Sequence, residues 1–128
     1  MSELIVFIST HRIREGRLEE FKEFSRKMMP LIEEGKPNTV FFQPYLNEEG
    51  TELTIVHVFP DADAMNLHFE GADERSERAY EFVQPVRFEI YGPASDNVTA
   101  TMRMQAGPGI GLTFKPENLA GFIRLQSG

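Results

Sequence analysis

The chain of 128 residues has the length of one domain, and its 41% hydrophobic and 26% charged residues are typical of a globular protein. A net charge of −7 without any Lys/Arg cluster argues against binding to nucleic acid or to an anionic membrane. The absence of cysteine excludes disulfides, thiolate nucleophiles and cysteine-ligated metals.

The N-terminal stretch MSELIVFIST lacks a basic region before its short apolar run, which indicates a strand and not a secretion signal. No apolar run approaches the ~18 residues of a membrane-spanning helix. We therefore expect a cytoplasmic protein that does not enter a membrane.

The first half of the chain predicts a strand, a helix and a hairpin. Residues 4–13 form a dense, β-branched apolar run, typical of a buried strand. Across 18–35, apolar side chains recur at spacings of three and four, which predicts an amphipathic helix. The runs 39–46 and 51–59, separated by the turn NEEG, should pair as antiparallel strands.

The next segment repeats the helix–strand order. Pro60 and Asp61 signal a helix start, and the helical pattern runs to about Val83 with an expected break near Gly71. Residues 86–92 then predict a fourth strand. The order βαββαβ predicts an α+β, ferredoxin-like fold with an antiparallel sheet.

The strand at 51–59 is apolar on both faces. Leu53, Ile55 and Phe59 point to one side, while Val56 and Val58 point to the other. Helices on a single side of the sheet leave the second apolar face uncovered. We therefore predict a homodimer in which two sheets pack face to face.

Residues 96–128 form a C-terminal extension to the domain 1–95. NVTATMRMQ (97–105) alternates apolar and polar residues and predicts a strand, followed by a glycine turn at 107–111 and a further short helix or strand. GPGIG lacks the later residues of a phosphate-binding loop, which makes it a turn. The extension can pack on its own domain or on the partner subunit.

Three histidines are the side chains that most suggest a functional site. His11 ends the first predicted strand, His57 lies on the third, and His68 lies on the second helix. Their spacing matches no metal-ligand pattern, so we predict no metal. His57 is expected to face the dimer seam or solvent, whereas the many phenylalanines can line an apolar pocket between sheet and helices.

Two stretches give the chain a family resemblance. EGRLEEFKEF (15–24) after the first strand and DADAMNLHF (61–69), which leads to His68, resemble the antibiotic biosynthesis monooxygenase-like domains of the dimeric α/β-barrel proteins. EIYGPA (89–94) is similar to the usual last strand, so the resemblance covers about residues 3–95. It implies a ferredoxin-like protomer, a dimer, and in some members oxidation of quinols or polyphenols by O₂ without a cofactor.

The resemblance places the family histidine at His68, which would act as general base because a neutral imidazole can accept a substrate proton. His11, Asn66 and Tyr80 would bind substrate oxygens, and phenylalanines such as Phe69 would keep the pocket dry. Asn66 is two residues from His68 and so does not share its helix face. The alternative is a dimer that binds a small aromatic molecule without turnover.

Overall fold

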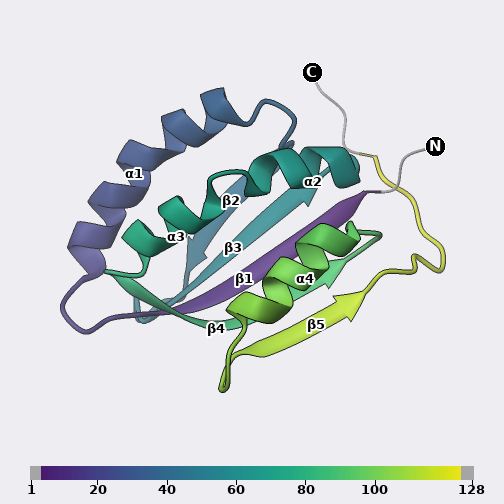
Figure 1. Cartoon of the computed structure of the whole chain (residues 1–128). Helices are drawn as coiled ribbons and strands as arrows, with labels where there is room; N and C mark the ends of the chain where they lie inside the picture. Colours follow the sequence, from purple (N-terminus) through teal and green to yellow (C-terminus); the bar gives the residue numbers. More distant parts are fainter. Residues whose placement is uncertain (1–3, 125–128) are drawn as a thin grey trace.

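The computed structural model describes residues 4–124 apart from the side chains of residues 72 and 73, and its five-stranded sheet carries the helices on one face (Figure 1). The strand order is β2-β3-β1-β4-β5. The elements are β1 (Ile5–Ile13), α1 (Leu18–Gly35), β2 (Phe41–Leu46), β3 (Glu52–Phe59), α2 (Ala62–Phe69), α3 (Ala72–Ala79), β4 (Val83–Tyr91), α4 (Asp96–Gln105) and β5 (Gly111–Lys115).

The predicted ferredoxin-like βαββαβ order is confirmed. β1 lies between β3 and β4 and pairs antiparallel with both, while β2 pairs antiparallel with β3. The predicted break in the second helix separates α2 from α3. It falls at Gly71, whose φ of 76° lies in the left-handed region that glycine adopts without strain.

The core forms where alternate strand residues point at the helices. Ile5, Phe59 and Ile90 are buried there together with Met65 of α2. A second cluster joins Phe21 of α1 to the other end of the sheet. Each fully buried side chain of this size contributes about 1.5–3 kcal/mol relative to an exposed one, so this face fixes the helices on the sheet.

The predicted strand at 97–105 is wrong, because this segment forms helix α4. The Ser95 side chain accepts a hydrogen bond from the Val98 amide at 3.2 Å and caps the helix. Val98 and Met102, four residues apart, are both buried in the main core cluster. The spacing of four also fits the helical period, so the apolar–polar alternation was misleading.

The extension also changes the sheet. An antiparallel sheet was predicted, but the fifth strand is parallel to its neighbour. β5 pairs in parallel with β4, with Leu112 opposite Phe88 and Phe114 opposite Ile90. α4 covers this end of the sheet in Figure 1, as expected for a parallel pair joined by a helical crossover. α4 and β5 thus pack on the sheet of their own chain, whereas residues 125–128 lie outside the described part.

The second face of the sheet carries no helix between residues 4 and 124 (Figure 1). Val6, Ile8 and Val56 point to this side, opposite to the buried Phe7 and His57 of the same strands. Single exposed apolar residues are common, but a contiguous apolar sheet face calls for a partner. None of the helices described is long and apolar enough to cross a membrane.

Gly92 closes the end of β4 and should not tolerate a side chain. It has a φ of 112°, and an added Cβ would lie 2.6 Å from the Leu4 carbonyl oxygen and 3.1 Å from Ile5 Cα. We expect Gly92→Ala to destabilise the fold by more than about 2 kcal/mol, measured by chemical denaturation. Gly35→Ala is the control: a Cβ there meets nothing within 4 Å, so the effect should be neutral or slightly stabilising. Equal stability of both variants would contradict the expectation.

Candidate functional site

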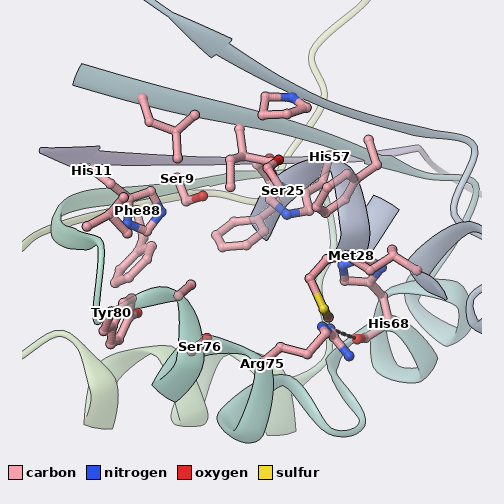
Figure 2. A pocket seen from close by; sticks show the side chains of 18 of the residues that line it. Ser9, His11, Ser25, Met28, His57, His68, Arg75, Ser76, Tyr80 and Phe88 are labelled. Carbon is pink, nitrogen blue, oxygen red and sulfur yellow. Dashed lines mark hydrogen bonds between the residues drawn. The ribbon is translucent and has the colours of Figure 1, made fainter. Parts of the chain in front are cut away.

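A cavity of about 160 Å³ lies between the helix-covered face of the sheet and α1, α2 and α3 (Figure 2). Most of its wall is apolar and aromatic, which is usual for a small-molecule site. Its polar lining residues are Ser9, His11, Ser25, His57, His68, Arg75, Ser76, Tyr80 and Gln105. Its apolar lining residues are Phe7, Phe21, Phe24, Met28, Met29, Ile32, Phe42, Pro44, Leu53, Ile55, Phe69, Ala79, Val83, Phe88 and Met102.

Helix α2 positions His68. The Asp61 carboxylate accepts a hydrogen bond from the Ala64 amide at 2.8 Å and fixes the start of the helix. His68 lies in the last turn, where the helix end presents free carbonyl groups. Lys36 donates to the Leu67 carbonyl at 2.8 Å, and Arg75 donates to the His68 carbonyl at 2.7 Å. Two cations therefore hold the helix end that carries the histidine.

The His68 side chain is buried and held by one hydrogen bond. Its Nδ1 lies 2.8 Å from the Thr39 hydroxyl, which can donate to this nitrogen or accept from it. Burial, with smaller effects from His57, Arg75 and Lys36, lowers the pKa of His68 to about 3. The imidazole is therefore neutral at physiological pH.

His57 faces the same cavity, which corrects the expectation that it faces the dimer seam or solvent. It shares the face of Leu53 and Phe59 on β3, and this alternation was already visible in the sequence. Its Nδ1 donates to the Phe7 carbonyl at 2.9 Å, so Nε2 carries the lone pair. Burial lowers the pKa of His57 to about 4, and its ring centroid lies 5.4 Å from that of His68.

His11 lies at the far end of the cavity from His68 (Figure 2). Its Nδ1 is buried and has no hydrogen-bond partner among the residues described. Burial lowers the pKa of His11 to about 4, and its ring centroid is 6.2 Å from that of Tyr80. A buried polar atom without a partner is rare in folded proteins, so this nitrogen is a contact that a ligand can satisfy.

The five sequence-predicted site residues separate into two groups. His68, His11, Tyr80 and Phe69 all line the cavity. Asn66 does not, because its side chain points toward α4, where its Oδ1 accepts a hydrogen bond from Ser95 at 2.7 Å. Its position two residues from His68 on a helix already indicated a different face.

Arg75 is a lining residue that the sequence did not indicate, because it lies among acidic residues on a polar helix. It lies on α3, which begins after the break at Gly71, and its side chain reaches the His68 carbonyl at the end of α2. No Asp or Glu side chain lines the cavity in the described part of the chain. The wall therefore combines three neutral imidazoles with one guanidinium, an arrangement that can accept a proton and stabilise an anion.

No protein-family model matches the sequence, and no curated protein does. Solved structures do match. MupZ from Pseudomonas fluorescens aligns over 98% of this chain and 100% of its own, with a TM-score of 0.77 and 19% identity. SnoaB from Streptomyces nogalater, a cofactor-independent oxygenase, aligns over 73% of this chain and 96% of its own, with a TM-score of 0.58 and 13% identity.

A candidate antibiotic biosynthesis monooxygenase from Bacteroides thetaiotaomicron aligns over 64% of this chain and 81% of its own, with a TM-score of 0.55 and 20% identity. The chain therefore has the fold of the antibiotic biosynthesis monooxygenase-like structures, and the resemblance read from the sequence is confirmed at the level of fold. Structures with this fold include a cofactor-independent oxygenase. MupZ is similar over nearly the whole chain, which includes the C-terminal extension.

Proposed function

We propose that the protein is a cofactor-independent oxygenase that oxidises a small aromatic substrate of the quinol or phenol type in the cavity between sheet and helices. The observation that carries the proposal is the wall itself, in which buried neutral histidines face an apolar, aromatic space that no described carboxylate lines. A phenol bound there loses its water shell, and a neutral imidazole is available to take its proton. Shared fold with an oxygenase supports the proposal only by analogy.

His68 is the proposed general base. When its Nδ1–H donates to Thr39, Nε2 carries the lone pair that accepts the phenolic proton. The phenolate then gives one electron to O₂, and the two radicals combine into a carbon-bound peroxide. The proton returns from His68, water leaves, and the product is a quinone with one oxygen atom from O₂. A low pKa keeps His68 unprotonated, and the nearby Arg75 charge favours the phenolate.

The test is oxygen consumption by the purified protein after chelation, with a panel of hydroquinones, catechols and naphthols. We expect uptake that continues without metal or flavin and yields a quinone and water. Uptake that appears only after a metal or a flavin is added would overturn the proposal.

Binding without turnover is the second candidate. A base is most effective when its pKa lies near the working pH, whereas burial lowers the pKa of His68 to about 3. The unpartnered Nδ1 of His11 also suits a ligand that is held and not converted. Saturable binding of an aromatic compound with no oxygen uptake across the panel would favour this function.

We also propose that two copies of the chain pack through the second face of the sheet, because Val6, Ile8 and Val56 form an apolar patch there and no helix of the described residues covers it. Sedimentation equilibrium should then show a dimer at micromolar concentration. Ile8→Asp should give a folded monomer, since an unpaired carboxylate in an interface costs several kcal/mol. Leu31→Asp is the control, because Leu31 is 62% exposed on α1 and lies off this face. A monomeric wild-type protein would refute the dimer.

A further inference from the structure

Among the side chains that the structure describes, Arg75 is the only charged one that lines the cavity. It comes from α3, and Figure 2 shows its guanidinium directed toward His68. Its Nη2 donates to the His68 carbonyl at 2.7 Å, and its Nη1 donates to the Glu70 carbonyl at 3.2 Å. These two bonds fix the position of the guanidinium at the cavity wall.

The positive charge of Arg75 is not neutralised by its partners. Both hydrogen bonds go to carbonyl groups, which are uncharged acceptors, and no ion pair between described side chains includes Arg75. The charge of Arg75 also contributes to the lowered pKa values of His57 and His68. Less water screens a half-buried charge beside an apolar space than an exposed charge. An anionic partner is therefore attracted more strongly to the half-buried charge.

The size of the cavity limits the ligand. An apolar cavity of about 150 Å³ is large enough to take up benzene. The cavity here is about 160 Å³, which corresponds to one aromatic ring with small substituents. Phe7, Phe42 and Phe88 supply aromatic faces against which such a ring can pack.

We infer that the ligand of this cavity is a single-ring aromatic molecule with an anionic oxygen, and that the Arg75 guanidinium binds this oxygen. The inference rests on the proposed function in taking this cavity as the substrate site. The anionic oxygen has two chemical sources. It is a carboxylate that the substrate carries, or it is the phenolate that forms when the substrate loses its proton.

The carboxylate source is tested with benzoate and benzamide, which have nearly the same shape and differ in charge. Isothermal titration calorimetry at pH 7 should show that wild-type protein prefers benzoate by about tenfold or more, the value of one charge-assisted hydrogen bond. Arg75→Gln should remove this preference. Arg78→Gln is the control, since it deletes a positive charge from the same helix at a residue that does not line the cavity.

The phenolate source is tested with 4-nitrophenol, whose ionised form has its own visible absorption band. Binding to wild-type protein should shift the midpoint of ionisation to lower pH, and Arg75→Gln should reverse this shift. Nuclear Overhauser effects between the protons of each probe and those of the His57 and His68 rings, measured by NMR, place the probe in the cavity. Thermal melts show whether the variants remain folded, and the wild-type comparison of benzoate with benzamide needs no variant.

A preference for either anion that depends on Arg75 supports the inference and identifies the source of the charge. Equal affinity for benzoate and benzamide, together with an unshifted nitrophenol, overturns it, and so does failure of all three probes to bind. These measurements detect binding and not oxygen uptake. An anion site without uptake would therefore leave the inference standing while the oxygenase proposal fails.

Discussion

Replacing His68 by alanine should reduce oxygen uptake by about 10²- to 10⁴-fold, the usual contribution of a positioned general base. His68 is buried at the cavity, and among the described residues its side chain forms one hydrogen bond, to Thr39, which leaves the second ring nitrogen for the substrate. Oxygen-electrode rates with the best substrate of the panel measure the effect. Ligand affinity should change less than the rate, because the phenylalanine walls remain.

Leu67→Ala is the matched control for His68→Ala. Leu67 precedes His68 on α2, is half-buried, and does not line the cavity. Leu67→Ala should therefore lower the stability of the fold about as much as His68→Ala does, but it should leave the rate of oxygen uptake near the wild-type value. Equal rates for wild type and His68→Ala would exclude His68 as the base and turn attention to His57, which also lines the cavity.

Acid should unfold this protein through its three buried histidines. The pKa values of His11, His57 and His68 fall from an ordinary 6.5 to about 4, about 4 and about 3 in the folded state. Because the unfolded chain binds these protons first, the folded state is fully favoured above pH 6.5. Stability then falls as the pH drops toward 4. At pH 5 each histidine costs about 2 kcal/mol, a large share of a domain's stability of about 5–15 kcal/mol.

Denaturant unfolding at pH values from 7 to 5 measures this effect. The slope of the free energy of unfolding against pH should rise from about one proton near pH 7 to about three protons near pH 5, since carboxylates are still mostly ionised in this range. His11→Asn removes one of the three groups and should lower the slope by about one proton. A pH-independent stability from 7 to 5 would show that the histidines are hydrated in solution.

Local periodicity predicted most elements correctly. Spacings of three and four residues gave α1, dense β-branched runs gave β1 and β3, and Gly71 marked the break between α2 and α3. These signals work because they reflect which face of one element must leave water. The segment 97–105 was predicted wrongly because its pattern fits two structures. The apolar–polar alternation fits a strand, whereas Val98 and Met102, four residues apart, fit a helix, and only packing against β4 and β5 selects the helix.

The sequence by itself determined the ferredoxin-like order and the presence of His68 on a helix that follows a strand, because both depend on short-range patterns and capping residues. The tertiary structure alone decided which side chains meet. It turned His57 into the cavity, directed Asn66 toward Ser95, and brought Arg75 from a polar helix to the end of α2. These contacts join residues from separate elements, and no local spacing specifies how a helix is rotated or folded back over a sheet.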